Sequence, residues 1–360
     1  MKVKSRQTRR EFMEGALFAG AAFAFPWSAK GEQISGMTGG GDFGTPLLTE
    51  RIPQPDGSFC VLIGFSPVTD QAAFIAGTFD RMSLYVSKPG QPDSFDVLWQ
   101  PNTDLAAIKT GAWSPNGSAI AFLVQAVNET TPKSGKISIY VVDVSSGVVR
   151  EPVVIVESAG GEEKQYAKAS YKKGLFWWDD SSVCVPADKA QDGPILKFDT
   201  HTGQSGVLAP VQHYTGVSKM TRVSYGEMRF VREKRTPLEN NGQFILCTML
   251  QDGSIREDIN LTEKLGRISD ITVNQQGDFV FAERGDAWTP ASVTNVIFKI
   301  ETQDVAAEIP RFVRYKKDMY AYKPLAVRND NELILMESVS LAKDDGSMGI
   351  PQIRVVKKAL

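Results

Sequence analysis

The chain of 360 residues is poor in the side chains that most often carry chemistry at neutral pH, because it has two histidines and three cysteines. Cys60, Cys184 and Cys247 are odd in number and show no C-x-x-C spacing, which disfavours a disulfide framework and a zinc site. Each lies in an apolar run, so we expect buried, reduced strand cysteines. Two histidines also narrow the classes of enzyme that the chain could form.

The sequence has neither an excess of basic charge nor a sustained helical period. Its net charge is -2 and its pI is about 5.9, so no overall basic field favours nucleic acid. Apolar residues almost nowhere recur at helical spacing for a dozen residues, which argues against helical repeats. With 42% hydrophobic residues, the chain can still bury one large core or two ordinary ones.

Residues 1–29 have the layout of an export signal. Several basic residues open the chain, and the uncharged stretch 15–27 that follows is too short to span a bilayer comfortably. We expect cleavage near Ala29, with a retained N-terminal anchor as the alternative, and no membrane segment after removal of the signal. The glycine-rich residues 30–45 then read as a flexible linker.

Within this signal, Arg9, Arg10 and Phe12 lie at the positions of a Ser/Thr-Arg-Arg-x-Phe-Leu-Lys motif. The stretch resembles the twin-arginine signal family, although Met13 and Glu14 replace the usual Leu and Lys. The resemblance implies a periplasmic or otherwise exported protein that folds before export. An ordinary secretory signal with adjacent arginines is the alternative.

The rest of the chain repeats one hairpin. Residues 111–124 end a strand at Trp113, turn through Ser-Pro-Asn-Gly, and return as a β-branched and aromatic strand. Weaker relatives recur along the chain, and the six starts are Phe65, Trp113, Trp178, Val223, Val273 and Val327.

A second hairpin follows within each unit. In residues 137–147 and 195–203, alternating apolar residues run into an Asp-x-x-Ser/Thr-Gly turn, in which Asp bonds the backbone and Gly takes a positive φ. Each unit is therefore four antiparallel strands. Four strands per period of about 45–50 residues predict an all-β, six-bladed β-propeller over residues 46–358. Seven blades, or a pair of β-sandwich domains, are the alternatives.

The second unit carries a family resemblance. Trp113 to Gly117, the strand Ile120 to Phe122 and the turn Asp143 to Gly147 resemble the WD-like propeller repeat of the TolB family, which also occurs in prolyl-oligopeptidase-type peptidases. The resemblance implies six blades and a face used for protein or peptide partners. Residues 30–50 are too short for the extra α/β domain of TolB, and no G-x-S-x-G stretch suggests a hydrolase. We therefore expect a stand-alone propeller.

The last unit shows three clear strands. Residues 46–52 form a short alternating strand before the first unit, and we expect them to supply the missing fourth strand.

Few residues suggest a catalytic or metal site. His201 lies in an Asp-x-x-Thr-Gly turn and His213 lies in a connection between units, so both read as solvated loop residues. The nearest approaches to acidic clusters read as turn residues, and they are Asp179-Asp180, Asp344-Asp345 and the stretch 283–286. We expect no metal and no cofactor.

Two basic stretches and a tryptophan pair are the other candidates for binding. Residues 229–235 and 311–317 mix basic and aromatic side chains, which is typical of two-faced strands, and an exported acidic protein disfavours nucleic acid. If functional, they suit anionic envelope components or an acidic loop. Trp177 and Trp178 lie on opposite faces of a strand, so we expect one in the core and one exposed to bind a partner.

The sequence thus favours an exported cell-envelope module that binds a protein or peptide partner through its propeller face, without catalysis. A propeller-type lyase, lactonase or glycosidase that uses scattered carboxylates or histidines is the alternative enzyme. A carbohydrate-binding or small-molecule sensor is the third hypothesis. The identity of the ligand does not follow from the residues.

Overall fold

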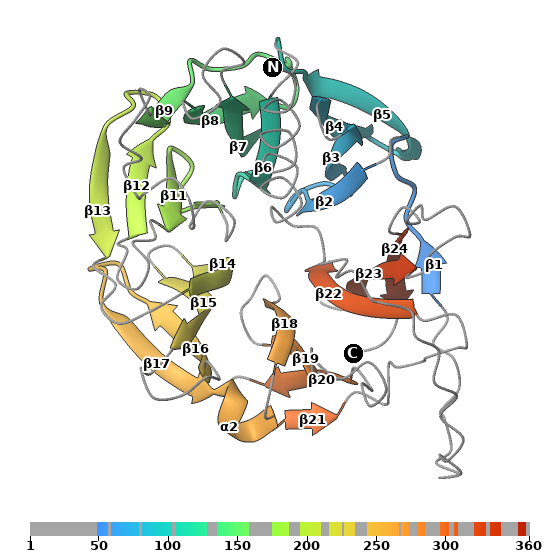
Figure 1. Ribbon diagram of the computed structural model, residues 1–360, viewed down its shortest axis with the longest axis vertical. Helices are drawn as coiled ribbons and strands as arrows, with labels where there is room; N and C mark the ends of the chain where they lie inside the picture. The colour runs from blue at the N-terminus through green and yellow to red at the C-terminus, as the bar shows by residue number, and fades with distance from the viewer. Residues whose placement is uncertain are drawn as a thin grey trace, which may run out of the picture.

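A computed structural model of the chain describes residues 49–56, 59–78, 81–102, 106–127, 135–157, 175–186, 195–209, 216–224, 227–234, 243–265, 268–273, 279–284, 296–301, 306–308, 320–328, 332–339 and 352–357. These residues form strands and a single five-residue helix, α2 (Leu261–Leu265). Groups of four antiparallel strands, here called blades, stand in a ring, each with one strand near the centre and one at the rim (Figure 1). A single parallel pair, Arg81 with Ala106, links the first two blades into one sheet. The chain is therefore an all-β propeller, as the repeat predicts.

The strands follow the ring in chain order. The first blade contains β2 (Phe59–Phe65), β3 (Ala72–Thr78), β4 (Arg81–Lys88) and β5 (Gln91–Trp99), and the second contains β6 (Ala106–Trp113), β7 (Ala119–Val127), β8 (Gly135–Asp143) and β9 (Val153–Glu157). The third contains β10 (Phe176–Trp177), β11 (Ser182–Pro186), β12 (Ile195–Asp199) and β13 (Ser205–Ala209), and the fourth contains β14 (Gly216–Ser224), β15 (Glu227–Lys234), β16 (Gln243–Met249) and β17 (Ile255–Asn260). The fifth contains β18 (Ile268–Val273), β19 (Phe279–Arg284), β20 (Val296–Glu301) and β21 (Ala306–Glu308), and the last contains β22 (Tyr320–Arg328), β23 (Glu332–Val339), β24 (Gln352–Lys357) and β1 (Thr49–Arg51).

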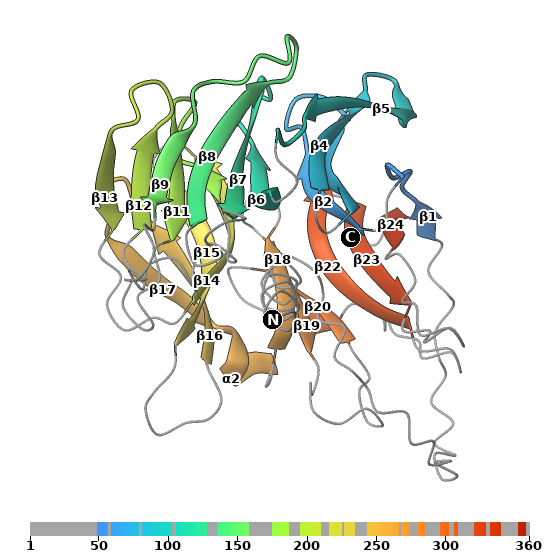
Figure 2. The same cartoon turned by 45° about the horizontal axis from the view of Figure 1, so that its top comes forward.

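The two ends of the described chain meet in one blade. β1 pairs antiparallel with β24, and Glu50 lies opposite Val355 (Figure 2). The expectation that a strand before the first unit completes the last one is confirmed for Thr49–Arg51. This pairing gives β24 a neighbour on the side that would otherwise be an open edge.

Adjacent blades are held together by apolar cores that lie between them. Ala73 and Leu84 of the first blade pack with Phe122 of the second, and Trp177 and Val183 of the third pack with Leu123 and other residues of the second. Further contacts of the same kind join the third blade to the fourth and the last blade to the first. A blade buries each of its faces only against a neighbour, so the stability of each depends on the ring.

The three cysteines form no disulfide and are buried in strands, as the sequence predicts. Burial raises the pKa of the Cys60 thiol to about 11, and it also raises the pKa of Cys184. Buried thiols with raised pKa values are poor nucleophiles. These cysteines therefore contribute to packing.

Strand pairing corrects the phase of the repeat in the third blade. Trp113 pairs with Ile120 across the first hairpin of its blade, and the residue in the same place in the third blade is Trp177, which pairs with Val183. The sequence pattern instead predicts Trp178 as the equivalent of Trp113. The turn between Trp177 and Val183 is one residue shorter than the turn between Trp113 and Ile120, and the residue equivalent to Trp113 is Trp177, one position before the predicted one.

Candidate functional site

The ends of the blades that carry the first and third turns form one face of the propeller, here called the turn face. Its described turns include residues 66–71, 114–118, 143–148, 178–182, 199–204 and 250–254. An aspartate accepts backbone N–H groups in several of these turns, and examples are Asp143, Asp199 and Asp252. The glycines that close them have φ between +67° and +80°, as the sequence pattern predicts, and they are Gly147, Gly203 and Gly253.

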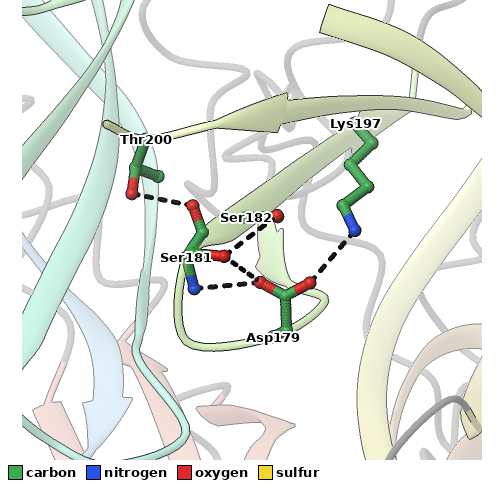
Figure 3. Close-up of polar contacts among 5 residues, drawn as sticks. All are labelled: Asp179, Ser181, Ser182, Lys197 and Thr200. Atoms are coloured by element: carbon green, nitrogen blue, oxygen red, sulfur yellow. Dashed lines mark hydrogen bonds and ion pairs between the residues drawn. The ribbon is translucent and has the colours of Figure 1, made fainter. Parts of the chain in front are cut away.

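A polar cluster of the third blade lies on this face (Figure 3). Asp179 lies in the turn between β10 and β11, and its Oδ2 accepts a bond from Lys197 Nζ of β12 at 3.0 Å. Its Oδ1 accepts the backbone N–H of Ser181 at 2.9 Å and the Ser181 hydroxyl at 2.8 Å. The carboxylate therefore joins a turn to the neighbouring strand through a charged bond.

Thr200 ties the second turn of the blade to the first. Its backbone N–H and its hydroxyl both donate to the Ser181 carbonyl oxygen at 2.8 Å. The Thr200 side chain is 4% exposed, so these bonds are shielded from water. These bonds join the two turns at this end of the blade.

Arg150 extends the cluster to the second blade. Its Nη1 donates to the Thr200 hydroxyl at 2.8 Å, and His201 Nδ1 lies 3.4 Å from the same oxygen. Two indoles make similar connections between blades, since Trp113 Nε1 donates to Gly64 O at 3.1 Å and Trp177 Nε1 donates to Ala112 O at 3.0 Å. Neighbouring blades are thus held against one another by hydrogen bonds as well as by apolar packing.

The electrostatics of the cluster keep the Asp179 carboxylate ionised and make it poorly suited to proton transfer. Burial alone would raise the pKa of Asp179, but the bonds from Lys197 and Ser181 outweigh it and lower the pKa to about 2. A general base works best when its pKa lies near the working pH, so this carboxylate is poorly suited to that role. Its hydrogen bonds suit a structural role, in which it holds the turn of Ser181 against Lys197 of β12.

The structure also describes other candidates from the sequence. His201 is exposed in its turn, as predicted, and Asp180 is exposed beside Asp179. The expected division of Trp177 and Trp178 into one buried and one exposed indole is wrong, because their exposed fractions are 3% and 9%. They lie on opposite faces of the third blade, and each face is covered by the next blade.

Several sequence predictions lie outside the described residues. These are the signal residues Arg9, Arg10 and Phe12, the linker 30–45, His213, Asp344-Asp345 and the basic stretch 311–317. The basic stretch that begins at Arg229 lies largely in β15, a strand as predicted.

Sequence reasoning missed Thr200, Lys197 and Arg150. The Asp-x-x-Thr-Gly pattern marks the turn that contains Thr200, but no local signal shows that Lys197 and Arg150 reach it. Within the described residues, no group of three or more His, Cys, Asp or Glu side chains is placed to hold a metal ion. No helix in that part of the chain is long and apolar enough to cross a membrane.

No family model and no curated protein matches the chain. Among solved structures, TolB from Acinetobacter baumannii is 14% identical, with a TM-score of 0.42, over 84% of this chain and 65% of that one. An oligogalacturonate lyase from Vibrio parahaemolyticus is 9% identical, with a TM-score of 0.49, over 87% and 97%. A Pyrococcus horikoshii acylaminoacyl peptidase is 12% identical, with a TM-score of 0.49, over 78% and 42%. The chain thus spans less than two thirds of the matched TolB and peptidase chains.

Proposed function

We propose that the chain is an exported binding or scaffold module of the cell envelope, and that its turn face receives a protein or peptide partner. The observation that supports this function is the bonding of the turn face, in which Asp179, Thr200 and Arg150 connect two turns and two blades. A surface that is already ordered loses little conformational entropy on binding, so affinity rises without extra contact area. The same fold can carry many different functions, so the fold alone does not determine the function of this chain.

Exposed side chains on the turn face give a partner apolar contacts. Val68 in the first turn of the first blade is 63% exposed, and Val148 after the third turn of the second blade is 62% exposed. Ser145 and Ser146 lie beside Val148 and are exposed as well. Mixed apolar and polar groups on a rigid support are typical of protein interfaces.

The proposed location is the periplasm or another exported compartment. The basis is the N-terminal signal with Arg9, Arg10 and Phe12, and replacement of both arginines by lysine tests it through the location of the protein in cell fractions. Loss of export for the double variant, with export retained for a variant of the linker 30–45, supports twin-arginine transport. Unchanged export points to the ordinary secretory route.

The binding function is tested with a photo-crosslinking amino acid at Val68, at Val148 and, as a control, at Val207. Val207 is 61% exposed but lies on β13 at the rim, so it matches the other two in exposure and differs in place. We expect one envelope protein to be captured from Val68 and Val148 and not from Val207. Capture from Val207 alone contradicts the proposal.

The same preparation separates the alternative functions. Turnover of an acidic glycan, a lactone or a glycoside that is lost on substitution of a turn-face residue would support an enzyme instead. Binding of a glycan or small molecule without turnover and without a captured protein would support a sensor.

A further inference from the structure

The turns of the turn face carry charge of one sign. In the first four blades, the described turns contain six aspartates and no lysine or arginine. These aspartates are Asp70, Asp143, Asp179, Asp180, Asp199 and Asp252. The four blades follow one another around the ring, so the aspartates form an arc on this face, here called the acidic arc (Figure 1). The net charge of the whole chain is -2, so the arc is more acidic than the chain as a whole.

The basic residues beside these turns are already bonded within the protein. Four of them lie within two positions of a turn. They and their partners are Lys88 with Asp96, Lys197 with Asp179, Arg256 with Asp258, and Arg150 with the Thr200 hydroxyl. Among the described residues, only the Lys197 bond neutralises an aspartate of the acidic arc. The other aspartates of the arc form no ion pair with the described part of the chain, so their charge faces any partner of the turn face uncompensated.

Hydrogen bonds within the turns keep carboxylates of the arc ionised. The Ser145 hydroxyl and the Ser146 N–H both donate to Asp143, and these bonds lower the pKa of its carboxyl group. Bonds from Ser254 lower the pKa of Asp252 in the same way. The turns therefore hold negative charge on this face at neutral and mildly acidic pH.

Asp70 and Asp180 have no such role in the fold. Both side chains are exposed, and neither makes a hydrogen bond or an ion pair with the described part of the chain. Like charges on one surface repel one another, and nothing in the described part of the fold compensates these two. A cationic partner compensates them, and the same charge attracts that partner to the face before contact.

Exposed apolar side chains lie within the acidic arc. Val68 is exposed and precedes Asp70 by two residues, and Leu250 is exposed and precedes Asp252 by two residues. Val148 is exposed and ends a turn of the second blade that also contains an aspartate. In three blades, one turn thus presents an apolar group beside a carboxylate. This combination suits a ligand that carries both apolar and positively charged groups.

We propose that the acidic arc binds a basic, amphipathic segment of a partner protein. The lysine or arginine side chains of that segment pair with the aspartates, and its apolar side chains contact Val68, Val148 and Leu250. This inference rests on the proposed function, since it assigns a chemistry to the partner that the turn face receives. The same negative charge repels nucleic acid and anionic lipid surfaces, so the face selects a cationic protein segment over both.

The test measures binding of a fluorescein-labelled peptide with two lysines for each leucine to the full chain by fluorescence anisotropy. An arc variant with Asp70→Asn, Asp180→Asn and Asp252→Asn is compared with a control that carries Asp56→Asn, Asp93→Asn and Glu263→Gln. The control makes the same change in net charge at exposed positions outside the turns. We expect at least fivefold weaker binding in the arc variant and less than a twofold change in the control.

The apolar part of the proposal has its own matched pair of variants. Val68→Ser with Val148→Ser removes apolar contacts from the arc, and Val207→Ser removes a similarly exposed valine from the rim. We expect weaker binding of the lysine–leucine peptide in the first variant only. A peptide with glutamate in place of lysine should not bind the unchanged chain, and binding of both peptides with equal affinity overturns the proposal.

Two further measurements keep the outcome interpretable. Near-ultraviolet circular dichroism establishes whether each variant is folded, and the double variant Asp70→Asn, Asp180→Asn replaces the arc variant if the change at Asp252 prevents folding. Equal binding by the arc and control variants overturns the proposal. Arc-dependent binding of spermine with no binding of the lysine–leucine peptide overturns the assignment to a protein segment in favour of a small cation.

Failure of this inference is distinct from failure of the proposed function. If crosslinkers at Val68 and Val148 capture the same envelope protein in the arc variant as in the unchanged chain, the scaffold function stands and the acidic-arc inference falls. If peptide binding depends on the aspartates but no protein is captured, the acidic arc stands as a site for basic peptides and the scaffold function falls.

Discussion

Replacing Asp179 with asparagine removes the negative charge from the polar cluster of the third blade and keeps the shape of the side chain. The Oδ1 of asparagine can still accept the two bonds from Ser181, so the main loss is the ion pair with Lys197. A pKa lowered from 3.8 to about 2 corresponds to roughly 2 kcal/mol, because one unit is worth about 1.4 kcal/mol. The side chains of Asp179 and Lys197 are 22% and 33% exposed, and solvent screening reduces the expected loss to about 1–2 kcal/mol.

The sign of the pH dependence follows from the direction of the shift. The pKa of Asp179 is lower in the folded state than in the unfolded chain, so the carboxylate stabilises the fold at pH values above about 4. This stabilisation is lost as the pH falls from about 4 towards about 2. The variant Asp179→Asn lacks the titrating group, so its stability should approach that of the unchanged protein in that window.

The assay is urea unfolding followed by tryptophan fluorescence at pH 7, 5, 4 and 3, with Asp180→Asn as the matched control. Asp180 is the next residue, is exposed, and makes no hydrogen bond or ion pair with the described part of the chain. We expect a constant deficit for Asp179→Asn down to about pH 4 and a smaller one at pH 3, with little deficit for the control. A deficit that does not change with pH, or equal deficits for both variants, refutes the role of the charge.

Three further changes test the packing of the ring. Gly117→Ala should cost about 1–3 kcal/mol, because φ is +68° and the new Cβ would clash with Val68 Cγ2. Gly90→Ala has the same φ and open space, so equal losses of stability would exclude the clash. Trp177→Phe should cost about 1 kcal/mol more than Trp178→Phe, because it leaves the Ala112 carbonyl without its donor, and equal unfolding midpoints would contradict this. Deleting residues 46–52 should lower the unfolding midpoint by more than deleting the linker before them, since β1 completes a blade, and equal midpoints would refute closure by β1.

The turns could be predicted from the sequence because each is encoded within a few residues. Gly117, Gly147 and Gly203 take the positive φ that their turns require, and Asp143 and Asp199 accept the backbone bonds that the Asp-x-x-Ser/Thr-Gly pattern predicts. Four strands per unit then follow from two such turns. Local chemistry of this kind does not depend on the rest of the fold.

The tryptophan pair could not be predicted in the same way. The local similarity of Trp178-Asp179 to Trp113-Ser114 suggests one register, but strand pairing sets another, with Trp177 opposite Val183. Side chains alternate along a strand, so a shift of one residue exchanges the faces of both indoles. Burial of Trp178 then depends on the fourth blade, whose Met228 and Phe230 cover it.

The polar cluster of the third blade depends on contacts that no local sequence pattern contains. Arg150 and Thr200 come from different blades, and they meet because the ring places the turns of neighbouring blades side by side. The ring in turn closes through β1 and β24, from opposite ends of the described chain. We expect such pairing to form late, because the closure entropy of a long loop is overcome only when the intervening blades are in place. On this expectation, the turn face becomes complete only when nearly the whole chain has folded. The three buried cysteines form no disulfide, so that step does not require an oxidising compartment, which suits the proposed export of an already folded protein.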